Sequence, residues 1–428
     1  RAKNVLDKRP FGSQLGMYDE GFEWINHSLQ PSTLKDADFR IVIGKQCAKP
    51  YNASVFNISA MSFGSLSANA ILSLNTGAKM GDFYHDTGEG SISRYHREPG
   101  GDLVWEIGSG YFGCRNKDGT FNEEIFARNA TLDQVKMIEV KLSQGAKPGH
   151  GGILPGEKVT PEIAEARGVE AGKDVVSPAS HSAFSTPKEF LEFLEKLRDL
   201  SGGKPVGFKL AIGHPWEWFA IVKAMLETGK TPDFIVVDGG EGGTGAAPLE
   251  FINRLGTPMT EALLLVHNTL VGTNLREHIA IGAAGKITSA FNIARTLALG
   301  ADWCNAARGY MFSLGCIQAL NCHTGRCPSG VATQDPRRSK KLDVQDKSQR
   351  VYNYHKNTLE ALMNLLEASG LKHPSELGPE HIIRRTSKTE IHSYMDLFTF
   401  LEPGALLEGE TGERVFDTYW PNATPDSF

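Results

Sequence analysis

The sequence predicts an α/β protein: a (β/α)8 barrel with an N-terminal arm and a helical C-terminal extension. Short apolar runs alternate with helical patterns from about residue 55 to residue 310. Several runs are continuously apolar, as strands of a parallel sheet must be when helices cover both faces. Eight strand–helix units in about 250 residues match the size of such a barrel. A doubly wound open sheet is the alternative; the Gly, His and acidic residues in the loops after the strands favour the barrel.

Eight short segments are the expected barrel strands. In chain order they are residues 55–61, 81–86, 135–142, 174–178, 205–212, 233–240, 278–285 and 301–309. Helices are expected between them. Residues 187–200 place apolar side chains on one face at a period of 3.6 and begin with Pro187. Residues 215–230 and 289–301 each carry a Gly near the end, as helix C-termini often do.

The remaining segments lie outside this repeat. Residues 1–50 are predicted to form the N-terminal arm, and residues 51–335 the barrel. Residues 336–428 are predicted to form the C-terminal extension, which includes a helix at residues 353–370. Residues 102–121 fit the repeat poorly. We expect them to form a hairpin or an extra strand inserted between the second and third barrel strands.

The composition excludes several classes of protein. The 428 residues carry a net charge of −5 and no basic block, so we expect no nucleic-acid partner. No apolar run is long enough to span a membrane, and there is no signal-peptide pattern. Six unevenly spaced cysteines do not resemble a disulfide framework, which favours a reduced, cytoplasmic location. The chain begins at Arg1, and membrane association through a segment upstream of that residue stays open as an alternative.

The loops after the last two predicted strands stand where barrels bind phosphate. Gly282 and Gly285 follow the seventh strand, and Arg308 and Gly309 follow the eighth. Backbone N–H groups and a helix N-terminus at these positions can hold an anion, and Arg308 would add a charged donor. Ordinary turn chemistry is the alternative.

Two further loops point to a ligand at the same end of the barrel. The loop after the sixth predicted strand is rich in glycine and includes Gly242 and Gly243, so its backbone can pass close to a flat or charged ligand. The loop after the third predicted strand brings Gln144, Lys147 and His150 to the same opening.

Lys209 lies within the fifth predicted strand. Burying an ammonium without a partner is costly, so a Lys209 that faces the barrel interior needs an anionic partner. The negatively charged pyrimidine end of a flavin would provide one. A surface lysine whose ammonium reaches water along an apolar stem is the alternative.

Three of the six cysteines, Cys316, Cys322 and Cys327, follow the eighth strand with the spacing C-x5-C-x4-C. Thiols gathered in one loop are typical of iron–sulfur or zinc sites. Zinc prefers four ligands, and three local thiols suit a [3Fe-4S] cluster better. Three unligated thiols are the alternative.

Six segments together resemble the flavin-binding synthase domain of glutamate synthases, over roughly residues 50 to 380. They are ISAMSFGSLS (58–67), GEGS (88–91), QGAKPGHGG (144–152), FKL (208–210), DGGEGGTGAAP (238–248) and GCIQALNCHTGRCPSGVATQD (315–335). The resemblance implies a (β/α)8 barrel that holds FMN and a [3Fe-4S] cluster. It also implies that electrons from ferredoxin or a pyridine-nucleotide partner pass through the cluster to FMN, which reduces 2-iminoglutarate to L-glutamate.

The resemblance also implies roles for individual residues. The residues expected to bind the cofactor are Ala60, Met61, Ser62, Gln144, Lys209, Gly242, Gly243, Gly285, Arg308 and Gly309. Glu89, Lys147 and His150 are expected to act on the substrate, with Arg167 and Lys147 binding it. The expected cluster ligands are Cys316, Cys322 and Cys327.

The sequence departs from the family pattern at the substrate. His150 stands where the family usually has Glu, and Ile153 where it usually has Gln, so the resemblance does not establish 2-oxoglutarate as the substrate. No glutaminase domain, N-terminal cysteine nucleophile or β-helical domain is recognisable in these residues. We therefore expect a stand-alone, glutamate-synthase-like protein.

The expected function is an oxidoreductase with FMN and a [3Fe-4S] cluster. It would reduce an imine or related bond of a 2-oxo-acid-derived carboxylate substrate with electrons from a ferredoxin-type donor. One alternative is a 2-hydroxy- or 2-amino-acid dehydrogenase or oxidase on the same barrel, which needs no cluster. Another is a non-catalytic electron-transfer subunit. The expected partners are a small carboxylate and ferredoxin or another electron-donor protein, while an amine-supplying subunit and a homo-oligomer stay open.

Overall fold

Eight parallel strands close into a barrel in the computed structural model, which describes residues 1–3, 11–409 and 411–428. Each strand pairs with the next in the chain, and the last pairs with the first. The strands are β4 (Phe56–Ile58), β5 (His85–Asp86), β6 (Leu103–Ile107), β7 (Val135–Lys141), β10 (Val206–Leu210), β11 (Phe234–Asp238), β12 (Ala280–Ala284) and β13 (Trp303–Ala306). The sheet closes on itself, so the predicted barrel is confirmed and the open sheet is excluded.

Two strand assignments from the sequence were wrong. Residues 102–121 contain β6, which is the third barrel strand and not an insertion. Residues 174–178 contain only β9 (Val175–Val176), which pairs antiparallel with β8 (Ile153–Leu154) outside the barrel. All five side chains of β6 are buried, whereas Val176 is 61% exposed. Glu106 interrupts the apolar run of β6, which is why a rule based on continuous apolar runs missed this strand.

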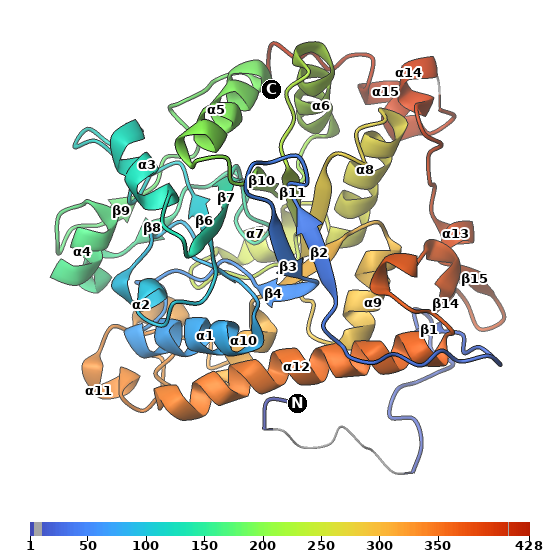
Figure 1. Cartoon of the computed structure of the whole chain (residues 1–428), viewed down its shortest axis with the longest axis horizontal. Coiled ribbons are helices and arrows are strands. Elements are labelled where there is room, and N and C mark those ends of the chain that lie inside the picture. Colours follow the sequence, from blue (N-terminus) through green and yellow to red (C-terminus); the bar gives the residue numbers. More distant parts are fainter. Residues whose placement is uncertain (4–10, 410) are drawn as a thin grey trace.

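Helices surround the barrel (Figure 1). They include α1 (Ala68–Gly81), α2 (Arg94–Arg97), α3 (Glu123–Ala130), α4 (Pro161–Arg167), α5 (Pro187–Leu200), α6 (Pro215–Thr228), α7 (Leu249–Arg254), α8 (Met259–Gly272), α9 (Ala290–Ala298), α10 (Arg308–Ser313), α11 (Pro336–Ser339) and α12 (Val344–Ala368). The helices predicted in the barrel repeat are confirmed as α5, α6 and α9. The helix predicted in the extension begins earlier, at Val344.

A hairpin closes the N-terminal end of the barrel. Strands β2 (Arg40–Ile43) and β3 (Tyr51–Ser54) pair antiparallel and lie across the middle of the barrel in Figure 1. Their buried side chains pack on inward-facing residues of the barrel strands, among them Tyr84, Phe234 and Trp303. The Trp303 indole donates to the Tyr84 hydroxyl at 2.8 Å, and that hydroxyl donates to Asn305 at 2.6 Å. This end is filled and hydrogen-bonded, which leaves the other end for a ligand.

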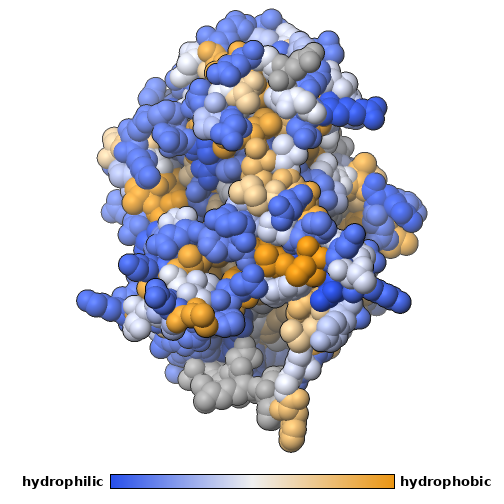
Figure 2. Space-filling view, turned by 90° about the vertical axis from the view of Figure 1, so that its right-hand side faces the viewer, coloured by the Kyte–Doolittle hydropathy of each residue, from blue (hydrophilic) through white to orange (hydrophobic). Residues whose placement is uncertain are grey.

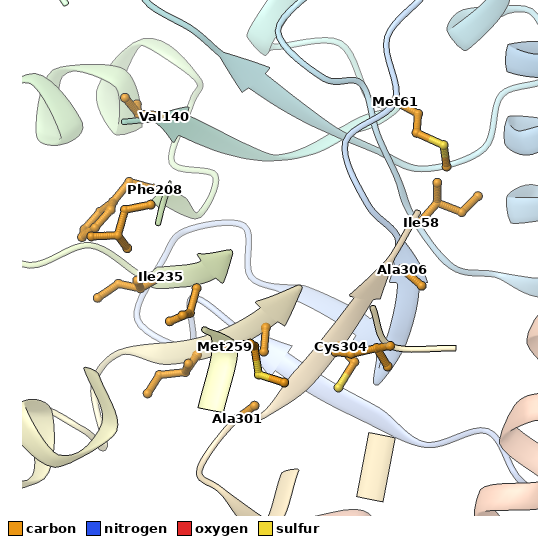
Figure 3. Close-up of a cluster of buried hydrophobic side chains, with 14 of the residues drawn as sticks. Ile58, Met61, Val140, Phe208, Ile235, Met259, Ala301, Cys304 and Ala306 are labelled. Carbon is orange, nitrogen blue, oxygen red and sulfur yellow. The ribbon is translucent and has the colours of Figure 1, made fainter. Parts of the chain in front are cut away.

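A second apolar core lies between the barrel and the helices. Figure 3 shows some of its buried side chains, including Ile58, Phe208, Ile235 and Met259 from different elements of the barrel wall. This core fixes the strands, so that the loops leaving their C-terminal ends have a rigid base.

The N-terminal arm and the C-terminal extension form one small sheet. β1 (Glu23–Ile25) pairs antiparallel with β14 (Ile382–Arg385), which pairs with β15 (Ile391–Ser393). The chain continues through α13 (Tyr394–Leu397), α14 (Ala405–Glu408) and α15 (Arg414–Tyr419). On the face shown in Figure 2, apolar residues occur in separate groups among hydrophilic ones. Among the described residues, no helix combines the length and hydropathy needed to cross a membrane.

α12 packs closely on α1, and the contact depends on a glycine. A methyl group on Gly77 of α1 would lie 2.5 Å from Val351 Cγ1 and 2.9 Å from the Ser348 carbonyl oxygen. Val351 and Leu362 of α12 are fully buried. The two helices can approach this closely only because position 77 has no side chain.

We predict that Gly77→Ala lowers the free energy of unfolding by about 1–3 kcal/mol, because overpacking costs this much in a well-packed contact. The loss should appear although alanine is the better helix former by about 1 kcal/mol. Gly213→Ala is the matched control, since its added methyl would meet no atom closer than 3.8 Å. Denaturant unfolding of both variants tests this. Equal stability of the two would show that α1 and α12 are not tightly packed at this point.

Candidate functional site

A pocket lies at the C-terminal ends of β6 and β7, where barrel enzymes carry their chemistry. Its lining includes Glu89, Lys141, Gln144, Lys147 and His150. Four of these five residues were selected from the sequence, and the structure brings them together. Lys141 was missed.

Lys147 and Glu89 are the central charged groups of this pocket. Burial lowers the pKa of Lys147, and the neighbouring Glu89 carboxylate partly opposes this shift. Glu89 forms an ion pair with Lys141, with 3.3 Å between Oε2 and Nζ. His150 is exposed, and its ring centroid lies 5.8 Å from that of Phe251 in α7. The pocket therefore holds two ammonium groups around one carboxylate, with an imidazole at its rim.

Arg167, the last residue of α4, is a buried cation close to Glu89. Its side chain lies over the ring of Phe112, with 5.1 Å from Cζ to the ring centroid. Its Nε has no hydrogen-bond partner among the described residues. Burial lowers the pKa of Arg167 to about 10, so the guanidinium stays charged at neutral pH. A buried cation with an open donor is a site at which an anion would be stabilised.

The residues expected to line a flavin ring follow β4. Ala60 and Ser62 are half-buried, and Met61 is buried. The Met61 N–H donates to the Asp86 carbonyl oxygen at 3.1 Å, which ties this segment to β5. These residues lie at the same end of the barrel as the pocket.

The glycine-rich loop after β11 lies close to two other loops of the same end. A methyl group on Gly243 would lie 3.5 Å from Arg308 Nη2, and one on Gly245 would lie 3.4 Å from Cys322 Cβ. The predicted phosphate residues, the glycine-rich loop and the cysteine loop are therefore neighbours. Gly242 and Gly285 also lie here, after β11 and β12.

Gly309 has a structural explanation that requires no ligand. A methyl group at this position would lie 2.0 Å from the Tyr354 hydroxyl of α12. That hydroxyl donates to the Thr288 carbonyl oxygen at 2.9 Å, so it is held in place. Packing against α12 is therefore sufficient to require glycine here.

The three cysteines selected from the sequence lie together. Burial raises the pKa of Cys322, and the charges of Cys316 and Cys327 raise it further, as thiols do when they are close. Burial of Cys327 would also raise its pKa, but hydrogen bonds from the Ala332 N–H and from Ser329 outweigh it and lower the pKa. A protein environment that favours one thiolate beside two others is suited to holding metal.

Lys209 already has anionic partners inside the barrel. Its ammonium forms an ion pair with Glu106 and lies 3.5 Å from Glu139 Oε2. Lys141 lies 3.9 Å from the other oxygen of Glu106, so the buried charges connect to the pocket. The sequence had suggested that a flavin would offset the charge of Lys209. Because these carboxylates already do so, Lys209 does not need a flavin for this purpose.

Three buried carboxylates around Lys209 were missed by the sequence analysis. Oxygen atoms of Asp86, Glu106 and Glu139 all lie within 4.8 Å of one another. Each side chain comes from one of three consecutive strands, β5, β6 and β7. The available signal was an acidic residue inside an otherwise apolar strand segment, as in VWEI and MIEV.

The protonation of this cluster follows from its geometry. Burial would raise the pKa of Glu106, but the charges of Lys209 and Lys141 outweigh it and hold the pKa low. Burial, then the charge of Glu106, raises the pKa of Asp86 to about 7. Burial, then the charge of Asp86, raises the pKa of Glu139 well above its ordinary value. At neutral pH, Glu106 is thus the ionised partner of Lys209, and Glu139 carries a proton.

We predict opposite outcomes for two isosteric substitutions in this cluster. Glu106→Gln should lower the free energy of unfolding by about 3–5 kcal/mol, because it leaves the Lys209 ammonium buried without its ionised partner. Glu139→Gln should instead raise it, because glutamine replaces an acid that is neutral in the folded protein and removes the ionisation that favours the unfolded chain at this pH. Denaturant unfolding at pH 7 measures both. Equal losses would contradict the assigned protonation states.

The same assignment predicts a pH dependence. Carboxyls whose pKa is raised on folding stabilise the protein fully at low pH, and this stabilisation is lost as pH rises through the folded pKa. Stability should therefore fall between about pH 4 and 7 as Asp86 ionises. The loss due to Glu139 extends to higher pH and should be absent in Glu139→Gln. Denaturant unfolding of the unmodified chain and of Glu139→Gln at pH 5 and pH 8 measures this. If the free energy of unfolding changes equally between the two pH values in both proteins, the prediction is contradicted.

Comparison with known proteins places the chain in a family. Residues 25–372 match the family model described as the conserved region in glutamate synthase. The glutamate synthase large subunit-like protein YerD of Bacillus subtilis is 45% identical over 357 residues, which cover 83% of this chain and 68% of that protein. An archaeal NADPH glutamate synthase of Methanocaldococcus jannaschii is 33% identical over 351 residues, covering 82% of this chain and 65% of that protein. The matched region thus spans about two thirds of each relative.

Solved structures agree on the fold. A flavocytochrome b2 mutant with pyruvate bound has a TM-score of 0.52 at 13% identity, covering 91% of this chain and 85% of that one. Another flavocytochrome b2 mutant, with sulfite bound, has a TM-score of 0.51 at 12% identity, covering 90% of this chain and 80% of that one. At such identity the likeness extends to the fold alone. The family match over most of the chain and the 45% identity to the Bacillus protein show that this chain belongs to the glutamate synthase family.

Proposed function

We propose that the chain is an oxidoreductase that uses FMN and a [3Fe-4S] cluster. Its substrate would be an imine, or a related bond, of a 2-oxo-acid-derived carboxylate, and its electrons would come from a ferredoxin-type donor. The observation that carries this proposal is that the glycine-rich loop lies close to both Arg308 and Cys322. A flavin cradle and a set of cluster ligands would then be immediate neighbours, as electron transfer between them requires.

Several residues fit FMN. Arg308 at the start of α10 and Gly285 after β12 stand where barrels hold a phosphate group. Met61 and Ser62 after β4 and Gln144 after β7 are available to the ring. When bound, FMN converts one-electron delivery into hydride transfer. Two strings match G-x-G-x-x-G, GSGYFG at 108–113 after β6 and GEGGTG at 240–245 after β11, but both strands belong to the one closed barrel, so neither string marks a separate dinucleotide-binding domain.

The cysteine loop fits an iron–sulfur cluster better than a single ion. Sulfur atoms around one zinc ion lie about 3.8 Å apart, given Zn–S bonds of about 2.3 Å. Among the described His, Cys, Asp and Glu residues, the one group of three whose ligand atoms all lie within 4.8 Å is the barrel cluster and not the three thiols. The three thiols are near enough for their charges to interact, but their sulfur atoms do not all lie within 4.8 Å of one another. A multi-iron cluster matches this spacing.

The charged groups in and near the pocket suit a small carboxylate. The buried Arg167 guanidinium can pair with a carboxylate, which would satisfy its open Nε. Lys147 and His150 line the pocket together with Glu89, and they are its available proton donors. Glu89, held by Lys141, can position an amine or imine nitrogen by accepting a hydrogen bond.

We predict that replacing Cys316, Cys322 or Cys327 with Ser removes the cluster, because thiolates are the ligands that iron–sulfur centres require. FMN content should persist, since the flavin residues lie in other loops. Cys47→Ser is the matched control, as Cys47 is also half-buried but precedes the barrel strands. Iron analysis and electron paramagnetic resonance of anaerobically purified protein measure this. Retention of the signal in all three variants would rule out the assigned ligands.

We predict weak glutamate formation from 2-oxoglutarate and ammonia, because His150 and the 44%-exposed Ile153 replace polar groups expected at the substrate. Loss of one such hydrogen bond can reduce turnover on the order of 10^4-fold. The double variant His150→Glu/Ile153→Gln should increase this turnover. Single-turnover reoxidation of the reduced flavin measures both proteins. Rapid glutamate formation by the unmodified chain would contradict this specificity.

A further inference from the structure

The buried acids of the barrel must respond to any charge that is placed near them. Asp86, Glu106 and Glu139 bring oxygen atoms within 4.8 Å of one another, and each of the three residues is at most 2% exposed. The ammonium of Lys209 lies among them. Three carboxylates beside one cation cannot all be ionised without a large cost, so the number of protons that they hold depends on the surrounding charge.

Asp86 is the member of this cluster that gains or loses its proton near neutral pH. Burial, then the charge of Glu106, raises the pKa of Asp86 to about 7. Glu106 is ionised beside Lys209, and Glu139 is protonated. The Glu139 carboxyl donates a hydrogen bond to Asp86, which favours the ionised form of Asp86. A change in the proton count of the cluster near pH 7 is therefore a change at Asp86.

Further titratable groups face the cluster from the neighbouring elements. They are Tyr84 of the segment before β5, Glu89 of the loop after it, Lys141 of β7 and Asp238 of β11. Burial raises the pKa of Tyr84 well above its ordinary value, so the phenol stays neutral. Asp238 accepts a hydrogen bond from the Gly145 N–H at 2.9 Å. Of these groups, Lys141 and Glu89 line the pocket.

Lys141 couples the cluster to the pocket. Its ammonium lies 3.9 Å from Glu106 Oε1 and 3.3 Å from Glu89 Oε2. An anion bound beside Lys141 would compete with Glu106 for this ammonium, and it would also add a negative charge close to the buried acids. Both effects favour the protonated form of a carboxyl group, and solvent screens them little because the side chains are buried.

We propose that Asp86 takes up one proton when a carboxylate binds in the pocket, so that the ligand and a proton enter the barrel together. The proton comes from solvent and returns to it when the ligand leaves. It offsets the negative charge that the ligand brings near the buried acids. Asp86 is thus a positioning residue that acts on the ligand through Glu106 and Lys141. This inference rests on the proposed function, because it requires a carboxylate ligand in the pocket.

Two side chains of the pocket compete with Asp86 as proton acceptors. His150 lines the pocket, and imidazoles commonly change charge between pH 5 and 8. It is exposed, however, so solvent screens it from the ligand charge more than it screens the buried cluster. Burial lowers the pKa of Lys147, and the charge of Glu89 opposes this shift. The geometry therefore favours Asp86, and the test must separate it from His150 and Lys147.

The test counts the protons taken up for each ligand bound. Pyruvate is titrated into the holoprotein at pH 7 by calorimetry, in buffers of different ionisation enthalpy, and without an amine or a reductant. The unmodified chain should take up about half a proton per pyruvate, because about half of the Asp86 side chains are ionised at a pH equal to their pKa. The Kd should rise about threefold or more between pH 7 and pH 8, as the ionised fraction grows.

Three isosteric or near-isosteric variants assign the proton. Asp86→Asn should abolish the uptake, and its side-chain oxygen can still accept from the Gly88 N–H, as Asp86 does at 2.9 Å. Glu139→Gln is the matched control within the cluster and should keep the uptake, because Glu139 is already protonated before the ligand binds. His150→Gln is the control within the pocket and should also keep it.

Pyruvate binding without proton uptake would overturn the proposal and leave the proposed function intact. Uptake that survives in Asp86→Asn, or that is lost in His150→Gln, would also overturn it. The infrared difference spectrum of pyruvate binding to the unmodified chain needs no variant: it should gain the carbonyl band of a protonated carboxyl, and absence of this band would contradict the proposal even if Asp86→Asn does not fold. Absence of any pyruvate or 2-oxoglutarate binding would instead refute the carboxylate site on which the inference rests.

Discussion

The ion pair between Lys209 and Glu106 is the interaction on which the inner structure of the barrel depends. It lies at the centre of a charged cluster that draws one residue from each of four consecutive barrel strands, β5, β6, β7 and β10. Three carboxylates and one ammonium cannot all be charged in a buried space without a large cost, so the cluster must hold a proton. The raised pKa of Glu139 expresses this constraint.

This cluster also connects the barrel interior to the pocket. Lys141 lies between Glu106 inside the barrel and Glu89 at the opening, at 3.9 Å and 3.3 Å. Opposite charges thus alternate from Lys209 to the residues expected to meet the substrate. A change of charge at the opening, such as substrate binding, would act on the cluster through this series, because screening is weak in a buried environment. The β2–β3 hairpin seals the opposite end, so the series leads only toward the pocket.

The sequence predicted the features that depend on local spacing. The cysteine loop, the glycine-rich loop and the cofactor segment at Met61 could all be found, because each is defined by residues close in the chain. The barrel could be predicted from repeated apolar segments, but β6 was missed because Glu106 breaks its pattern. β9 was taken for a barrel strand because two valines imitate one, although its backbone turns back on β8.

The charged interior could not be predicted in this way. The partners of Lys209 come from strands 70 or more residues earlier in the chain, and their meeting depends on barrel closure and strand register. The same holds for Arg167, whose burial depends on α4 folding over Phe112. The resemblance to the glutamate synthase family already pointed to Arg167. The open Nε of Arg167, however, becomes apparent only in three dimensions.

The central claim is that a flavin and a three-iron cluster share one opening of this barrel. Anomalous diffraction at the iron edge, from crystals of anaerobically purified protein, tests it most directly. The account predicts three iron positions enclosed by Cys316, Cys322 and Cys327, with flavin density against the loops after β12 and β13. Four iron positions, a single zinc position or flavin density elsewhere would contradict it.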